Sequence, residues 1–535
     1  MPILTRIRPC IQRFGQAPLL SLCWLVALTA SVWPFWASAL LPFQDLPQHL
    51  ATVRVLHSYH DPAFGVSHYF AIALGRTQYL AWYFLVDWLT YLLPLETAAR
   101  VVFSLYAIGV PLSLAALLRA HRRDLHVALL SIPLIFNPFL FMGLANYVTA
   151  LPLVFWALAL LQRLLDAFTW RRFLLLTAVT TLIFYDHAQA FLLYVALAGV
   201  TTLLGAPGLH PRHWCKQLLH LLPSGVAMLV WLQKSLILAS AQEWHQGLGG
   251  RNVAPPEARW KPIAERLTDF MANLSDVYHD DLDEKLLVSL LILLGVAWVL
   301  GRDRVRTQQP SVRETLRDHL PEMLLVTAFF IYLASPYSWK WIAPLAERLI
   351  PAVALLAIPA FARHSMPFRT WTLAIPATVL AVMTAKVHAD HAQAFSAEAG
   401  PIRQVVAQAE KGKRLMALIF QSQSAVMKQP VYLHFGQYYV IDRGGMANFS
   451  FANFPQSPVL FPDVGGPPLV PPRFEWTPEV FTMATQGYWY DYFLIRDENL
   501  QRNPFGAERA QVELVTRQGP WALYKNLQPA PLKKD

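Results

Sequence analysis

Two side chains that can move protons follow the first apolar run of the chain. The stretch LLPFQDLPQHLATVRVL, residues 40–56, contains Asp45 and His49, which stand four residues apart. That spacing places both side chains on one face of a helix, and carboxylates and imidazoles commonly donate and accept protons in proteins. Two other roles stay open. Asp45 could cap a helix that begins at Leu46, with Pro47 in its first turn, and His49 could be an interfacial histidine hydrogen-bonded to water.

Asp186 and His187 form a second unusual pair, because they interrupt apolar sequence at membrane depth. Ionisable groups in such places are costly and usually face a cavity or a partner. We therefore expect Asp186 and His187 to contact a ligand or, alternatively, to cap a helix end at the membrane interface. Asn146, in the stretch GLANY, is a third polar candidate, and its simpler role is to form a turn.

The chain shows no clear motif for a metal or a cofactor. His57, His60 and Asp61, in HSYHD, have a spacing that permits a metal, but such clusters are common in loops. The three cysteines are too scattered for a disulfide framework or a thiolate metal site. No phosphate-binding glycine motif of the nucleotide-binding kinds occurs. We predict no cofactor and no bound metal, with a divalent cation as the open alternative.

The composition places these candidates in a membrane protein. The 535 residues are 55% hydrophobic and 15% charged, with a mean hydropathy of +0.34, whereas about a quarter of the residues of a soluble domain are charged. Apolar runs of the length of a membrane helix recur to roughly residue 385 and then stop. The first run is too long for a signal peptide, so we interpret it as a membrane anchor. The predicted fold class is a polytopic α-helical membrane protein with a C-terminal soluble α/β domain.

Clusters of arginine and lysine predict the orientation of the spans. Such clusters collect in cytoplasmic loops, and six of them punctuate the apolar region. If all six are cytoplasmic, successive clusters are separated by two crossings, which gives about 11 spans, a cytoplasmic N-terminus and an outward C-terminal part. The predicted spans are residues 18–41, 98–118, 126–142, 147–165, 172–186, 188–206, 217–238, 286–300, 322–337, 345–362 and 370–387.

Two segments decide this count. Residues 173–206 could form one helix of about 50 Å, at about 1.5 Å per residue, but we predict two short spans that turn at Asp186 and His187. Residues 79–93 are apolar enough for a span, yet we interpret them as an amphipathic helix on the outer membrane interface, where aromatic residues are favoured. The large outward loops of residues 1–387 are then residues 42–97 and 239–285.

The C-terminal part, residues 388–535, is predicted to be a small soluble α/β domain. It carries 14 basic and 13 acidic residues, so nearly all of the net charge of +10 belongs to residues 1–387. That excess marks topology and not a nucleic-acid surface, so we predict no nucleic-acid partner. The residue patterns predict a helix over 397–413 and strands at 414–420, 431–442, 490–496 and 512–526, the last a hairpin around Gln518 and Gly519.

In layout the chain resembles the GT-C superfamily. These are integral-membrane glycosyltransferases that use polyprenyl-phosphate sugars, and they include the aminoarabinose lipid A transferases and the protein mannosyltransferases. The resemblance covers roughly residues 1–390 and rests on the acidic residue of DLPQHLA, on YLAWYFLVDWLTYLLPLETAAR, and on Glu347 and Arg348 before a late span. Many relatives carry a paired-acidic signature in the first loop, whereas this chain has Asp45 alone.

The resemblance implies a role for each candidate. Asp45 would be the general base that takes a proton from the attacking acceptor in an inverting displacement, and His49 would orient Asp45 or contact the phosphate. Lys340 and Arg348 would bind the phosphate of the donor, with Arg348 favoured because a guanidinium binds phosphate in bidentate fashion. A salt bridge or an interfacial position is the alternative for Arg348. Contacts with the acceptor or the sugar are assigned to Asn146, Asp186, His187 and Glu347.

The implied function is transfer of a sugar from a polyprenyl-phosphate carrier to an outward-facing lipid, glycan or protein. The expected location is a bacterial inner membrane, with the C-terminal domain in the periplasm. One rival is a non-enzymatic transporter of lipid-linked glycans or an envelope-assembly scaffold. A transporter usually has internal repeats, and the sequence shows none. A second rival, an O-antigen ligase or polymerase, would have a large outer loop without the acidic residue of the first loop.

Overall fold

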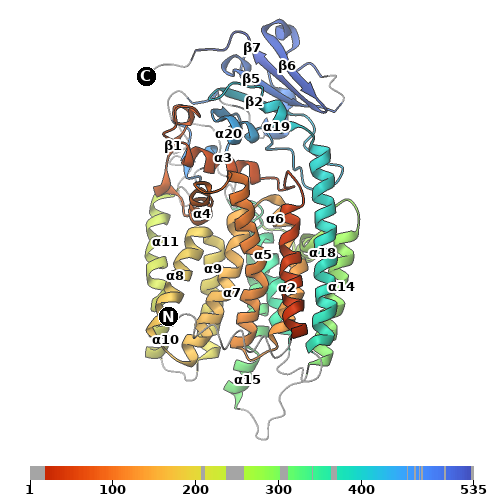
Figure 1. The fold of residues 1–535 in the computed structure, drawn as a ribbon. Helices are drawn as coiled ribbons and strands as arrows, with labels where there is room; N and C mark the ends of the chain where they lie inside the picture. Colours follow the sequence, from red (N-terminus) through yellow and green to blue (C-terminus); the bar gives the residue numbers. More distant parts are fainter. Residues whose placement is uncertain are drawn as a thin grey trace.

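A bundle of long helices carries a small strand-containing domain at one end. Figure 1 shows the helices side by side, with the C-terminal domain above them and α15 at the opposite end. The computed structural model describes residues 18–206, 211–235, 258–301, 311–339, 342–362, 370–454, 456–462, 466–468, 470, 474–498 and 502–531. The main helices below that domain are α2 (Pro18–Val32), α5 (Leu95–Ala120), α7 (Ala145–Asp166), α8 (Trp170–Asp186), α9 (Ala188–Gly205), α10 (Pro211–Leu218), α11 (Leu222–Lys234), α13 (Ile263–Ser275), α14 (Leu282–Leu300), α15 (Val312–Asp318), α16 (Leu320–Ala334), α17 (Ile350–Phe361) and α18 (Thr370–Ala399).

Length and hydropathy mark several helices as membrane spans. Within the described ranges, six helices are long and apolar enough to cross a membrane: Pro18–Trp36, Leu95–Ala120, Ala145–Asp166, Ala188–Gly205, Trp214–Lys234 and Thr372–Val406. They indicate a multi-pass membrane protein. Helical structure occurs at each of the eleven predicted spans, but several of these helices are short for a crossing. The count of eleven therefore stays a prediction.

The predicted span over residues 126–142 consists of two pieces. Leu125–Ile135 is a 3₁₀ helix with Pro133 inside it, and α6 covers only Pro138–Met142. Between them, the side chain of Asn137 accepts hydrogen bonds from the first backbone N–H groups of α6. A proline that removes a donor and a new helix cap together prevent one continuous α-helix. The second piece ends in the turn that borders the candidate site.

The two segments on which the predicted span count depends, residues 173–206 and 79–93, contain the predicted helices. Residues 173–206 form two helices, because α8 ends at Asp186, His187 is extended and α9 begins at Ala188. The amphipathic segment contains α4 (Ala81–Thr90), which packs against α5, α7, α8 and α3 (Leu46–His57). In Figure 1, α3 and α4 lie at the end of the bundle that carries the C-terminal domain.

Basic residues meet at the other end of the bundle. Arg123, after α5, donates hydrogen bonds to both carboxylate oxygens of Glu322 at 2.7 Å. Arg317 of α15 pairs with Asp166 at the end of α7. Because α15 lies opposite the C-terminal domain (Figure 1), these residues lie on the side that the sequence assigns to the cytoplasm. The orientation within a membrane stays a prediction.

The C-terminal domain is built on a five-stranded sheet with the strand order β3-β2-β5-β7-β6. The central strands β2 (Arg414–Ile419) and β5 (Tyr492–Arg496) are parallel, as are β2 and β3 (Met446–Ala447). The strands β6 (Val512–Gln518) and β7 (Trp521–Asn526) form the predicted hairpin. The domain is therefore a mixed α/β structure.

Two predictions for this domain need correction. The predicted strand at 431–442 is wrong, because the segment forms turns followed by the buried helix α20 (Gln437–Arg443). A short apolar run cannot be assigned to a strand or a buried helix by periodicity alone. The predicted helix at 397–413 is divided between the end of α18 and α19 (Ile402–Val406), because Gly400 has a φ of +64° and Pro401 follows it.

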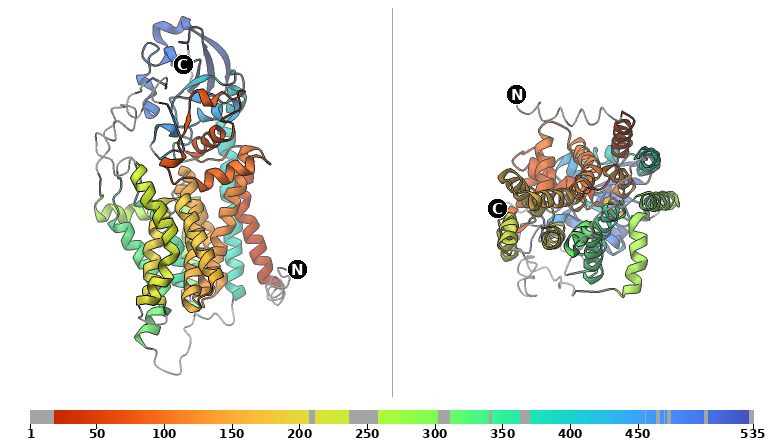
Figure 2. Two further views of the ribbon diagram at one scale, coloured as in Figure 1. Left: turned by 90° about the vertical axis from the view of Figure 1, so that its left-hand side faces the viewer. Right: turned by 90° about the horizontal axis from the view of Figure 1, so that it is seen from below.

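The first outward loop and the C-terminal domain are joined by direct contacts. β1 (Ala71–Ile72) pairs with β4 (Val459–Leu460), and α3 packs on α20. Buried hydrophobic residues of both parts belong to one continuous cluster, and α18 runs across residue 387 to Ala399. Figure 2 shows the first loop, in red and orange, between the bundle and the blue C-terminal domain. The candidate site lies in this junction.

Candidate functional site

Asp45 lies at the N-terminus of α3 but does not cap it. Its side chain makes no hydrogen bond with the first turn of α3, which contains Pro47. Its Oδ1 atom is buried and makes no aligned hydrogen bond with the described residues. The backbone N–H of Asp45 donates to the carbonyl of Met142 at 3.0 Å. The residue is thus held through its backbone, and its carboxylate is available for chemistry.

The turn between α6 and α7 determines where Asp45 lies. Gly143 ends α6 with a φ of +89°, a conformation that favours glycine. A Cβ atom on Gly143 would lie 2.6 Å from the backbone nitrogen of Asp45 and 3.0 Å from its Cα atom. Glycine therefore permits the close approach of the two segments. α7 begins at Ala145, so the buried Asn146 stands in its first turn beside the same space.

His49 lies one turn further along α3. Its Nδ1 atom is 2.6 Å from the hydroxyl oxygen of Tyr83 on α4, and its ring packs edge-on against Trp82 and Phe451. Burial lowers the pKa of His49 to about 4, although the Asp45 carboxylate opposes that shift. His49 is therefore neutral at pH 7. It can orient a neighbouring group but adds no positive charge.

A cation faces the same space from the other side. Arg348 lies in the 3₁₀ helix Glu347–Leu349, just before α17, and is 9% exposed. Its guanidinium donates to the carbonyl of Ala343 at 3.3 Å, and its Nε atom has no hydrogen-bond partner among the described residues. A buried guanidinium with unused donors is suited to bind an anion.

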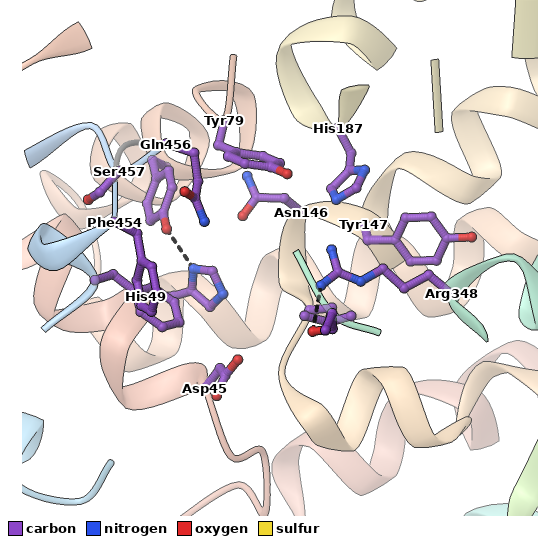
Figure 3. Close-up of a pocket in the computed structure, with 14 residues that line it drawn as sticks. Asp45, His49, Tyr79, Asn146, Tyr147, His187, Arg348, Phe454, Gln456 and Ser457 are labelled. Atoms are coloured by element: carbon purple, nitrogen blue, oxygen red, sulfur yellow. Dashed lines mark hydrogen bonds between the residues drawn. The ribbon is translucent and has the colours of Figure 1, made fainter. Parts of the chain in front are cut away.

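A cavity of about 200 Å³ separates Asp45 from Arg348. Figure 3 shows Asp45 and His49 on one side of it, and Arg348 with His187 on the other. Two residues that line it have a buried polar atom without a hydrogen-bond partner within the described ranges, namely Asn146 Nδ2 and His187 Nδ1. Such atoms can hydrogen-bond a polar ligand. The C-terminal domain supplies one wall with Phe451, Phe454, Gln456 and Ser457.

An apolar cavity of about 400 Å³ lies under α4, between α5, α7 and α8. It is adjacent to the polar cavity, because α4 contributes Trp82 to one and Tyr83 to the other. In the same way, Asp186 lines the apolar cavity and His187 the polar one. The Oδ2 atom of Asp186 accepts a hydrogen bond from the hydroxyl of Thr149 at 3.0 Å. Asp186 therefore lines the apolar cavity, next to the residue His187 that lines the polar one.

The structure brings together most, but not all, of the predicted site residues. Asp45, His49, Asn146, His187 and Arg348 line the polar cavity. The remaining candidates behave differently: Asp186 lines the neighbouring cavity, Glu347 is buried in an ion pair with Lys261 at 3.3 Å, and Lys340 lies outside the described residues.

The histidines of the first loop contact several neighbouring side chains. His57 contacts the carboxylate of Asp87 at 2.8 Å. In the part of the chain that the structure describes, no group of three or more His, Cys, Asp or Glu side chains is arranged to hold a metal ion.

Sequence reasoning missed two groups of lining residues. Tyr79 and Tyr83 stand four residues apart in the segment interpreted as an interfacial helix, and that spacing could have indicated a polar stripe facing inward. Phe451, Phe454, Gln456 and Ser457 carry no such signal, because they come from a loop about 400 residues away in the sequence. Only the docking of the C-terminal domain places them in the cavity.

Comparisons with known proteins find few relatives. No protein-family model and no curated protein matches the chain. Among solved structures, the chain is similar to the arabinofuranosyltransferase AftD from mycobacteria, with 13% identity and a TM-score of 0.47. The match covers 95% of this chain and 40% of that protein, so this chain spans well under half of its length. At this identity and TM-score the likeness says nothing about activity.

Proposed function

We propose that the protein is a membrane glycosyltransferase that moves a sugar from a polyprenyl-phosphate carrier to an outward-facing lipid, glycan or protein. The observation that carries this proposal is the placement of Asp45 and Arg348 on opposite sides of one cavity. Displacement at a sugar-phosphate bond needs a base at the attacking group and a cation at the departing phosphate. An inverting displacement needs them on opposite sides of the anomeric carbon.

Each residue has a defined role in this reaction. The acceptor oxygen or nitrogen forms a bond with the anomeric carbon, and Asp45 takes its proton. The bond between that carbon and the phosphate oxygen breaks, its electron pair stays on the phosphate, and Arg348 stabilises the charge. Neutral His49 orients the reacting groups, while Asn146 and His187 hydrogen-bond the sugar or the acceptor.

The apolar cavity under α4 is suited to the hydrocarbon chain of the carrier. Apolar side chains of four helices line it, and it adjoins the polar cavity. A carrier lipid would thus keep its chain in apolar surroundings while its phosphate reaches Arg348. The proposed location is the bacterial inner membrane, with the C-terminal domain in the periplasm.

Binding and transfer can be measured separately on the protein in lipid nanodiscs. Native mass spectrometry with undecaprenyl phosphate reports binding, and release of that lipid from a panel of undecaprenyl-phosphate sugars reports transfer. Arg348→Ala should weaken binding by about 10- to 100-fold, since it removes charge-assisted hydrogen bonds. Asp45→Asn should bind normally but lose about 10²- to 10⁴-fold in turnover, the usual contribution of a general base.

The exposed Arg171, at the far end of α8, offers a matched control. Arg171→Ala should change neither measurement. Full transfer by both Asp45→Asn and Arg348→Ala would refute the assigned roles. Binding of undecaprenyl phosphate by the wild type, without transfer from any sugar of the panel, would favour a transporter or a scaffold.

A further inference from the structure

A histidine of the C-terminal domain contacts Asp45 from outside the cavity. His434 lies just before α20, and its Nδ1 atom is 3.1 Å from Oδ1 of Asp45. The His434 side chain is 6% exposed, and the residue does not line the cavity. The two atoms are close but not aligned as a hydrogen bond. Hydrogen bonds of catalytic groups are often poorly aligned until substrate binds. The present geometry is therefore compatible with a hydrogen bond between His434 and Asp45 in the substrate complex.

Several contacts hold His434 in this position. Its ring stacks on Phe449 with a centroid distance of 5.0 Å and an angle of 12° between the ring planes. Its carbonyl accepts a hydrogen bond from the backbone N–H of Gln437 at the start of α20. The side chain is thus held in place before any ligand binds. Ordering it therefore adds no further entropy cost during a reaction.

The helix that carries Asp45 is docked on the same part of the C-terminal domain. Gln48 donates to the carbonyl of Phe449 at 3.2 Å, and the backbone N–H of Phe451 donates to Gln48 at 3.1 Å. One turn and a half further along α3, Arg54 donates to the carbonyl of Ile441 in α20 at 2.9 Å. These contacts fix α3 relative to His434. The distance between His434 and Asp45 is therefore a consequence of domain docking.

We propose that His434 is a positioning residue for Asp45. It holds one carboxylate oxygen, so that the other is left for the proton of the acceptor. This inference rests on the proposed function, in which Asp45 is the general base. His434 acts only through Asp45, because it lies outside the cavity. The base is then complete only while the C-terminal domain is docked on α3.

Other polar groups near Asp45 have different partners. The Nδ1 atom of His49 is engaged with the hydroxyl of Tyr83 at 2.6 Å. Arg348 lies across the cavity, where the proposed phosphate binds. Among the residues that the structure describes, His434 can hold Oδ1 of Asp45 without competing with the substrate.

Two substitutions separate positioning from packing. His434→Phe keeps a ring to stack on Phe449 but loses the polar atom, whereas His434→Asn keeps a polar atom at the place of Nδ1 but loses the ring. If His434 positions Asp45, the Phe variant should lose about 10- to 100-fold in kcat, as a misplaced catalytic group does, and the Asn variant should retain most of it. Binding of undecaprenyl phosphate should stay unchanged in both. A packing role predicts the reverse order of the two variants.

A second measurement needs no turnover. Dicyclohexylcarbodiimide modifies protonated carboxyl groups in apolar surroundings, and peptide mass spectrometry reports the modification of Asp45, with Asp45→Asn as the blank. If the contact at 3.1 Å holds Oδ1, its loss should change the rate of Asp45 modification several-fold in His434→Phe, whereas His434→Asn should keep the wild-type rate. Equal labelling and equal kcat in the Phe variant and the wild type would overturn the inference. Absence of any transfer by the wild type would count against the proposed function instead, and labelling would still decide the role of His434.

Discussion

Gly143→Ala should impair the proposed chemistry without removing any polar group. Gly143 has a φ of +89°, and a Cβ atom there would lie 2.6 Å from the backbone nitrogen of Asp45. The atoms in the way belong to the backbone and the Cβ atom of Asp45, so no flexible side chain can move aside. The turn between α6 and α7 and the start of α3 must therefore separate.

The size of the effect follows from that distance. Ordinary contact begins near 3.4 Å, so the two segments must move apart by about 0.8 Å. A misplacement of about 1 Å can cost about 10²-fold in rate. We expect kcat to fall about 10- to 100-fold. The left-handed backbone should cost a further 1–2 kcal/mol or so in stability. Binding of undecaprenyl phosphate should persist, because Arg348 lies on another element.

The assay compares release of undecaprenyl phosphate by the wild type, Gly143→Ala and a matched control in nanodiscs. Gly199 of α9 is that control, because a Cβ atom there would meet nothing within 4 Å. Gly199→Ala should keep wild-type turnover and gain up to about 1 kcal/mol of stability. Wild-type kcat in Gly143→Ala, at wild-type binding, would show that the position of Asp45 does not limit the reaction.

Two further predictions concern pH and the apolar cavity. Burial lowers the pKa of His49 from its ordinary value of about 6.5 to about 4 in the folded chain. Between these two pH values, His49 binds a proton in the unfolded chain but not in the folded chain. The stability contribution of His49 is thus complete above pH 6.5 or so and is lost toward pH 4, by about 2 kcal/mol at pH 5. Thermal unfolding should show His49→Gln gaining that amount relative to the wild type between pH 7 and pH 5; a constant difference would contradict the buried neutral state. Leu153→Trp should fill the apolar cavity and weaken binding of undecaprenyl phosphate about tenfold, by about 1.4 kcal/mol, whereas Leu192→Trp on the exposed face of α9 should not; equal binding by both variants would exclude this cavity as the site of the lipid chain.

Much of the fold could be predicted from local sequence. Apolar runs locate the helices because a membrane span must be long and apolar, and the break at His187 follows from ionisable groups that interrupt such a run. The strands β2, β5, β6 and β7 coincide with predicted segments. The segment 431–442 could not be assigned correctly, since its apolar tyrosines and valine suit a buried helix as well as a strand.

For the candidate site too, the sequence indicated the residues but not their contacts. Asp45, His49, Asn146 and His187 were proposed from residue type and position, because polar groups beside apolar spans are costly unless they have a use, and Arg348 was proposed from the family resemblance. The structure places all five around one cavity. The partners of these residues could not be found. Glu347 stands next to Arg348 in the sequence, yet it pairs with Lys261.

The sequence by itself thus determined that the protein is a helical membrane protein and which polar residues lie near the ends of its apolar segments. These properties follow from local composition and hydropathy, which act along the chain. Only the tertiary structure decided that Asp45 faces Arg348 across one cavity and that His434 contacts Asp45 at 3.1 Å. The contact of His434 arises because the C-terminal domain docks on α3 through contacts between residues about 400 positions apart. The position of Asp45 opposite Arg348 arises from the packing of the α6–α7 turn against Asp45 and from the 3₁₀ helix before α17. No local pattern records such contacts.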